Sequence, residues 1–192
     1  MAKLLAYPEP MDVVQFLAFY ETRPEGEKWE LLDGKLVMNA TPVNRHQAIV
    51  ANLIGELEFR LRKGGRRFRA TAGIGTRLSG RSLVEPDVMI RERAILDGNV
   101  CDDVIVAFEV LSLSTRRNDL VWKRRNYTAL ATLTHYVVVS ADKPEVRVYA
   151  RAMDWQEQKL NRLTEEIIFT NLGLKLSIAE IYDDVLSFRA LN

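Results

Sequence analysis

The sequence predicts an α/β fold, with a central mixed β-sheet flanked by helices. Two observations lead to this prediction. Residues 42–63 repeat apolar positions at helical spacing, and an apolar run at 104–111 is followed by a helical segment and a strand-like run at 136–139. Such a crossover commonly joins parallel strands, whereas tight turns join antiparallel ones, so the sheet should be mixed. Without a linker or repeat, the chain should form one domain, with its core at about 12–150 and a C-terminal strand and helix extension.

Two helices are expected in the first third of the chain. Asp12 is a suitable N-cap for a short amphipathic helix at 13–21. The second helix covers about 42–63 and ends at Gly64-Gly65. Its apolar stripe consists of Ile49, Val50, Leu53, Ile54, Leu57 and Leu61.

A β-hairpin should lie between these helices. The strand-like segments 29–32 and 35–38 flank Asp33-Gly34, a dipeptide that tolerates the positive φ angles of a two-residue turn. Glu30 therefore lies on a strand.

The middle of the chain favours strands joined as a meander. The expected extended segments are 67–72, 74–78, 83–90 and 104–111. The density of apolar residues at 104–108 indicates a central strand that is buried on both faces.

The last third returns to a helix followed by more strands. Asp119 should open a helix that runs to about residue 131, and strands should follow at 136–139, 146–150 and 167–169. The segment 177–180, Ser-Ile-Ala-Glu, resembles a capping box that starts a short C-terminal helix.

The composition excludes several classes of function. A net charge of +1 gives no support for nonspecific binding of polyanions by the whole surface. The single cysteine, Cys101, excludes an internal disulfide and a cysteine-rich zinc cluster. No run approaches the roughly 20 apolar residues of a spanning helix, so we expect a cytoplasmic protein that does not enter a membrane.

Two carboxylates occupy segments that would otherwise be apolar and buried. Asp87 lies within Pro-Asp-Val-Met-Ile, and Glu109 lies in the run 104–111. An unpaired buried carboxylate is costly, whereas two carboxylates that share a divalent cation are stabilised. We expect these two residues to bind magnesium, with manganese as the alternative ion and the main-chain carbonyl of Val110 as a further ligand.

Lys123 is the next candidate, because it could reach back toward Glu109. Asp119, Lys123 and Tyr127 are spaced four residues apart and should share one face of the expected helix. If the site hydrolyses a phosphodiester, Lys123 could orient the attacking water or offset charge on the phosphate. Asp119 would then hold the Lys123 side chain in place. The alternative is an ordinary surface ion pair, which spacing alone favours.

Histidine and arginine side chains complete the set of candidates. His46 lies on the apolar stripe of the long helix, so we expect a packed, hydrogen-bonded histidine, with a contact to substrate or water as the alternative. Two clusters of the sequence are rich in basic residues. They are candidates for binding nucleic acid, and a solvated charged face is the alternative. They are Arg60, Arg62, Lys63, Arg66, Arg67 and Arg69, and Arg116, Arg117, Lys123, Arg124 and Arg125.

The ordered succession of short motifs over about residues 12–150 resembles a known family. Pro86-Asp87 followed by Glu109-Val110-Leu111 is similar to the motif of the PD-(D/E)XK nuclease superfamily. The wider pattern resembles the large bacterial "putative restriction endonuclease" family. It comprises Trp29-Glu30-Leu31-Leu32-Asp33-Gly34, Arg45-His46-Gln47, Val84-Glu85-Pro86-Asp87-Val88, residues 108–115, Asp119 to Lys123, and His135-Tyr136.

The resemblance implies a restriction-endonuclease-like fold and a site made of Asp87, Glu109 and Glu30. Where the superfamily pattern has lysine, this chain has Leu111, which cannot supply a charge. In this family the role passes to the following helix, which here offers Lys123, so the resemblance favours a site role for that residue. For Glu30, a solvent-facing position on an amphipathic strand is the alternative.

The leading hypothesis is a magnesium-dependent DNA endonuclease, a hydrolase of phosphodiester bonds. Phosphates would be contacted by Arg116, Arg117, Arg124 and Arg125 without reading of bases. Duplex cleavage usually needs two sites, so a homodimer is expected. Two rival hypotheses remain. The first is a catalytically silent nuclease fold that binds nucleic acid or a protein, which Leu111 motivates. The second is a structural domain in which arginines such as Arg91 cap the acids.

Overall fold

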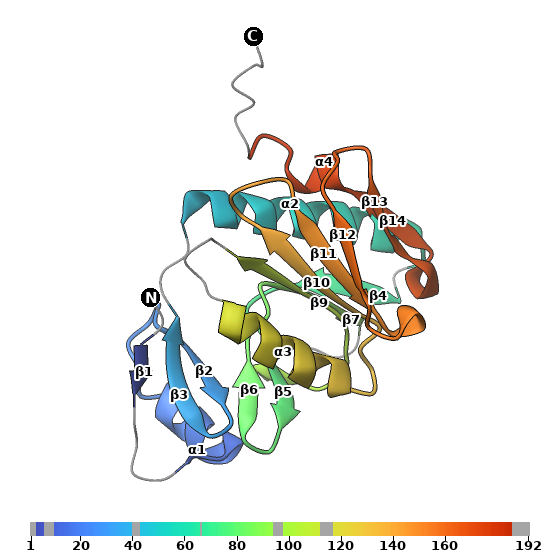
Figure 1. Cartoon of the computed structure of the whole chain (residues 1–192). Helices are drawn as coiled ribbons and strands as arrows, with labels where there is room; N and C mark the ends of the chain where they lie inside the picture. Colours follow the sequence, from blue (N-terminus) through green and yellow to red (C-terminus); the bar gives the residue numbers. More distant parts are fainter. Residues whose placement is uncertain are drawn as a thin grey trace.

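A computed structural model describes residues 3–5, 10–39, 43–65, 67–93, 98–111 and 117–185; of residues 3–5 and 117–119 it describes the backbone alone. These residues form two six-stranded sheets and one two-stranded sheet, with helices packed around them (Figure 1). The predicted mixed α/β fold is confirmed. None of the helices in these ranges is both long enough and apolar enough to cross a membrane.

The first sheet, sheet A, carries the predicted hairpin. Its strands, in spatial order, are β1 (Lys3–Leu5), β3 (Lys35–Asn39), β2 (Lys28–Leu32), β6 (Ser82–Val84), β5 (Gly75–Ser79) and β8 (Val100–Cys101). Helix α1 (Val13–Tyr20) packs on one face of this sheet, where Phe16 meets Trp29 and Leu31. Asp12 is the N-cap of α1, which confirms that prediction, and it forms a capping box with Gln15.

The turn of the hairpin has the positive φ angles that its sequence predicts. Asp33 has φ 50° and Gly34 has φ 82°. A Cβ at Gly34 would lie 2.6 Å from the Cβ of Pro10, so the close approach of the chain also requires glycine there.

The second sheet, sheet B, is the central mixed sheet. Its strands, in spatial order, are β12 (Glu157–Leu160), β11 (Val146–Ala150), β10 (His135–Ser140), β9 (Val104–Leu111), β7 (Val88–Glu92) and β4 (Phe68–Thr71). Helix α3 (Arg117–Ala129) connects β9 to β10, and these two strands are parallel, whereas the other neighbours in sheet B are antiparallel. The predicted strand, helix, strand crossover is confirmed.

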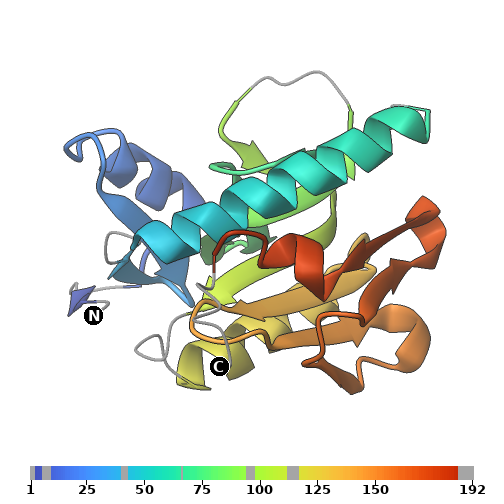
Figure 2. The ribbon, with the colours of Figure 1, turned by 90° about the horizontal axis from the view of Figure 1, so that it is seen from above.

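Alternate residues of β9 face opposite layers of the molecule. Val106 and Phe108 pack in one core with helix α2 (Asn44–Lys63), whereas Ala107 packs in another core with Tyr127 of α3. Figures 1 and 2 show α2 crossing one face of sheet B and α3 lying on the other. Glu109 follows Ala107 by two residues, so its side chain points toward α3.

The C-terminal part covers the α2 side of sheet B. Strands β13 (Glu166–Phe169) and β14 (Leu174–Ser177) pair with each other, and α4 (Ile178–Ile181) contacts α2. Ser177 and Glu180 form the predicted capping box. Two short 3₁₀ helices, η1 (Arg151–Met153) and η2 (Thr170–Leu172), lie in the connections.

The middle of the chain differs from its prediction. The segment 83–90 was expected as one strand of a meander, which is wrong, because the chain leaves sheet A after β6 and enters sheet B at β7. Pro86 has no N–H to donate, and the N–H of Glu85 donates to the Glu30 side chain instead of to a neighbouring strand. Strands β1, β8, β12 and β14 were not predicted, and β8 has only two residues.

Glu58 on α2 provides a test of the packing between α2, β4 and β7. Its carboxylate accepts hydrogen bonds from Arg93, Arg62 and the N–H of Ala70. Burial alone would raise the pKa of Glu58, but these donors lower it from 4.5 to about 2. Because the folded pKa is depressed, this stabilisation is present above pH 4.5 and is lost as the pH falls toward 2.

We therefore expect Glu58→Gln to lower the free energy of unfolding at pH 7 by about 1–2 kcal/mol. The difference from the wild type should shrink as the pH falls from 4.5 toward 2. Urea denaturation at a series of pH values measures both quantities. The half-exposed Glu92, which pairs with Arg67, is the matched control, and Glu92→Gln should have little effect. A loss from Glu58→Gln that stays constant with pH would contradict this account.

Candidate active site

Strand pairing brings Asp87 and Glu109 to the same end of sheet B. Asp87 directly precedes β7, and Val88 lies opposite Phe108 in the antiparallel pair of β7 and β9. The N–H of Val110 donates a 2.7 Å hydrogen bond to Oδ2 of Asp87. Two acids that are 22 residues apart in the sequence therefore lie at one end of the adjacent strands β7 and β9.

Lys123 of α3 joins this pair to sheet A. Its Nζ lies 3.1 Å from both carboxylate oxygens of Glu109 and 2.9 Å from Oε1 of Glu30. The side chain of Lys123 is 13% exposed, that of Glu109 5% and that of Glu30 3%. The low exposure of Glu30 excludes the solvent-facing position that was the alternative for this residue, and Lys123 is not an ordinary surface ion pair.

Glu30 also holds the segment that precedes Asp87. Its Oε1 accepts the N–H of Glu85 at 3.0 Å in addition to the Lys123 ammonium. Glu30 lies on β2, and its neighbours Trp29 and Leu31 face α1 on the opposite side of the sheet. A single carboxylate thus fixes both the lysine and the break between β6 and β7.

Tyr127 orients the Glu109 carboxylate. Its hydroxyl lies 3.2 Å from Oε1 of Glu109, and its ring stacks on that of Tyr136 with centroids 5.1 Å apart. Burial, with the nearby charge of Glu109, raises the pKa of Tyr127 well above its ordinary value. Tyr127 therefore stays protonated and serves as a donor.

His46 contacts Asp87 from the first turn of α2. Its Nε2 lies 3.2 Å from Oδ1 of Asp87, and its Nδ1 is buried without a hydrogen-bond partner. His46 is partly buried and contacts a carboxylate of the predicted site, and the hydrogen bond that was expected for this histidine stays a prediction.

The charges at this site do not balance. Three carboxylates, those of Glu30, Asp87 and Glu109, face one lysine and one histidine. Burial raises the pKa of Glu109; the charge of Lys123 opposes this rise, whereas those of Asp87 and Glu30 add to it. Burial alone would lower the pKa of Lys123, but Glu109 and Glu30 raise it well above its ordinary value, so the lysine remains charged.

The donor set fits a hard divalent cation. Its unbalanced groups are carboxylate oxygens, the ligands that magnesium prefers. Within the described ranges, no group of three or more His, Cys, Asp or Glu side chains lies close enough together to hold a metal ion. The fit therefore rests on the pair Asp87 and Glu109. The N–H of Val110 is directed at Asp87, and the predicted role of the Val110 carbonyl stays a prediction.

Of the four arginines that were predicted to contact phosphates, two have described side chains. Arg116 lies outside the described residues, as do the side chains of Arg117 and Asp119. Arg124 and Arg125 are exposed on α3, and the Arg124 guanidinium lies 5.0 Å from the centroid of the Tyr149 ring.

Arginine capping of the two acids is not observed. Arg91 pairs with Asp103 at 3.0 Å, and among the described side chains no arginine forms an ion pair with Asp87 or Glu109. In the first basic cluster, Arg60, Arg62 and Arg67 pair with glutamates. These three arginines of the cluster are thus engaged in ion pairs.

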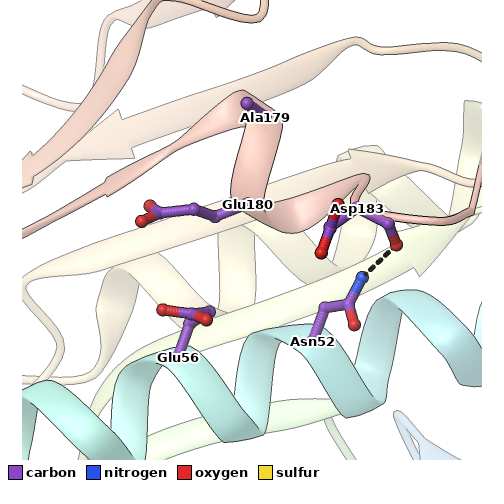
Figure 3. A pocket seen from close by; sticks show the side chains of 5 residues that line it. All are labelled: Asn52, Glu56, Ala179, Glu180 and Asp183. Carbon is purple, nitrogen blue, oxygen red and sulfur yellow. Dashed lines mark hydrogen bonds between the residues drawn. The ribbon is translucent and has the colours of Figure 1, made fainter.

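A separate concavity of about 290 Å³ lies between α2 and α4 (Figure 3). Among its polar groups, the Asn52 amide donates to the carbonyls of Ile181 and Asp183, and Arg60 bridges Glu56 and Glu180. It does not include the cluster around Lys123.

Sequence reasoning missed two parts of this site, the N–H of Glu85 and the ring of Tyr136. The tyrosine lies within the His135-Tyr136 motif, which could have indicated its importance. The role of the Glu85 N–H has no signal in the sequence, because a main-chain group gives none.

Comparisons with known proteins agree with this architecture. A family model named Uma2, with the description "Putative restriction endonuclease", matches residues 13–179. A crystal structure titled as a putative nuclease belonging to DUF820, from Anabaena variabilis ATCC 29413, is similar in fold, with a TM-score of 0.75 and 17% sequence identity. The similarity covers 92% of this chain and all of that chain. No curated protein sequence matches the chain.

The raised pKa of Glu109 predicts an unusual dependence of stability on pH. Because the folded pKa lies above the unfolded value of 4.5, the folded state binds more protons than the unfolded state above pH 4.5. Without metal, we expect the free energy of unfolding to fall with rising pH, by up to about 1.4 kcal/mol per pH unit, until Glu109 is ionised.

Glu109→Gln should remove this decline, whereas Glu166→Gln, which changes a surface acid paired with Lys175, should keep it. Urea denaturation in the presence of a chelator, from pH 5 upward, measures the slope. An equal slope in the wild type and in Glu109→Gln would show that Glu109 titrates normally.

Proposed function

The chain belongs to the Uma2 family, described as "Putative restriction endonuclease", and on this basis we propose that it is a metal-dependent endonuclease that hydrolyses phosphodiester bonds of DNA. The observation that carries the proposal is the position of Lys123. Its ammonium lies between Glu109 of sheet B and Glu30 of sheet A, and Glu109 lies beside Asp87. Two acids and a nearby amine are the groups that metal-assisted phosphodiester hydrolysis requires.

Asp87 and Glu109 would hold magnesium, or manganese in its place, with the Val110 carbonyl as a further ligand. Bound there, the ion would offset charge on the phosphate and lower the pKa of a bound water molecule. Oxygen ligands and retained waters suit magnesium, which does not need a cage built wholly of protein.

Lys123 would act on the substrate, whereas Glu30 and Tyr127 would hold other site residues in place. Lys123 would place a fixed positive charge beside the reacting phosphate or hold the attacking water. Glu30 would anchor Lys123, and Tyr127 would keep the Glu109 carboxylate in one orientation. Lys123 would thus supply the amine that Leu111 cannot, which supports a catalytic role over the alternative of a catalytically silent nuclease fold.

Binding of DNA would use exposed cations around α3. Arg124 and Arg125, together with Arg116 and Arg117, would contact phosphates without selecting a sequence. Cleavage of both strands of a duplex would follow from a homodimer that presents two sites.

Nicking of a supercoiled plasmid tests the catalytic proposal. The wild type should convert the plasmid in the presence of magnesium or manganese, and Asp87→Asn or Glu109→Gln should reduce the rate by at least about 100-fold. Glu166→Gln, at a surface acid, should cleave as the wild type does. Normal cleavage by either site variant would overturn the assignment of the two ligands.

Lys123→Met gives a second test, because two properties should change in opposite directions. Removing the ammonium from Glu109 frees both carboxylate oxygens, so magnesium affinity should rise by about tenfold while cleavage falls by about 100-fold or more. Isothermal titration calorimetry measures the affinity.

The control for this test is Lys28→Met. The charge of Lys28 acts on Asp87, but its ammonium forms its hydrogen bond with Glu85. Its effect on metal affinity should be smaller. Unchanged or weaker magnesium binding by Lys123→Met would contradict a metal site at Glu109.

A further inference from the structure

The residue before Lys123 makes its own contact with sheet A. The indole N–H of Trp122 donates a 2.6 Å hydrogen bond to Oδ2 of Asp33, in the turn between β2 and β3. Asp33 lies three residues after Glu30, the carboxylate that Lys123 contacts. Two consecutive residues of α3 therefore bind two nearby carboxylates of the same hairpin.

Asp33 is itself held firmly by β6. Its N–H donates to Oγ of Ser82 at 3.1 Å, and that hydroxyl lies 3.4 Å from Oδ1 of Asp33. The N–H of Gly34 donates to the carbonyl of Arg81 at 2.7 Å. With one oxygen near Ser82, which is fully buried, the other is directed to Trp122.

The position of α3 relative to both sheets decides where the lysine ammonium lies. On the side of sheet B, Tyr127 of α3 stacks on Tyr136. On the side of sheet A, the described side chains of α3 that form hydrogen bonds are those of Trp122 and Lys123. A lysine side chain is long and flexible, so it needs a fixed helix to keep its ammonium between Glu30 and Glu109.

We propose that Asp33 and Trp122 are positioning residues for the cleavage reaction, a role that rests on the proposed function. Their hydrogen bond fixes the second turn of α3 against sheet A and so keeps the Lys123 ammonium between the two carboxylates. Misplacement of a catalytic group by about 1 Å can cost about 100-fold in rate, so loss of one such bond should be measurable.

Trp122→Phe tests the proposal, because it keeps an aromatic ring and removes the N–H donor. We expect kcat for plasmid nicking to fall about tenfold while KM for DNA stays unchanged. Asp33→Ala should cause the same loss, and the double variant should lose no more than either single one. Asp33→Asn keeps an acceptor and tolerates the left-handed turn, so it should retain most of the activity.

The chain offers a matched control in Trp29, whose indole N–H donates to Oε2 of Glu27 at 2.7 Å. Trp29 packs against α1, away from Lys123. Trp29→Phe removes the same kind of bond and should lower stability without lowering kcat. Equal loss of kcat in Trp29→Phe and Trp122→Phe would mean that the bond acts through general stability alone, which would overturn the positioning role.

A second readout needs neither metal nor DNA. The ¹⁵N NMR signal of the Lys123 ammonium can be assigned by its absence in Lys123→Met. In the wild type, the two carboxylate partners should protect the ammonium protons from exchange with water, so that the signal is observable. It should shift and broaden in Trp122→Phe but not in Trp29→Phe. An unchanged signal in Trp122→Phe would overturn the proposal. Failure of the wild type to cleave DNA would instead count against the proposed function, because this signal is independent of activity.

Discussion

The ion pairs of Lys123 with Glu30 and Glu109 are the interaction on which the centre of the molecule depends. Each partner comes from a different element, β2, β9 or α3, and each is almost fully buried. A buried charge is tolerated only when it is paired and hydrogen-bonded. Removal of any one of the three residues would therefore leave a buried charge without a partner, at a cost in stability. The same contact that joins sheet A to sheet B also collects the groups suited to catalysis.

Local signals in the sequence predicted most of the elements. The N-cap at Asp12, the capping box at Ser177 and the Asp33-Gly34 turn act over a few residues, and they appear where expected. The division of the strands between two sheets was not predictable in this way. At the break between β6 and β7, Pro86 has no N–H to donate, and Glu30 accepts the N–H of Glu85, a contact between residues 55 apart in the sequence.

The candidate site was predictable to the extent that its residues belong to motifs. The order of Glu30, Asp87, Glu109 and Lys123 in the sequence indicated a common site, and the structure brings them together. The bond between Trp122 and Asp33 was missed, because Asp33 already had a sufficient local explanation as a turn residue. A side chain that serves both a turn and a contact 89 residues away shows only the first role in its sequence.

The hydrogen bond from Val110 to Asp87 has a consequence for ion selectivity. Because the main chain engages Oδ2, this carboxylate would present Oδ1 alone to an ion, and Nε2 of His46, which lies 3.2 Å from Oδ1, would share that oxygen or give it up. Coordination through one oxygen is therefore favoured. Calcium takes six to eight oxygens and often binds a carboxylate through both of its oxygens, whereas magnesium keeps octahedral geometry and several waters. Under the proposed function, a backbone amide on β9 would thus discriminate against the larger ion through denticity.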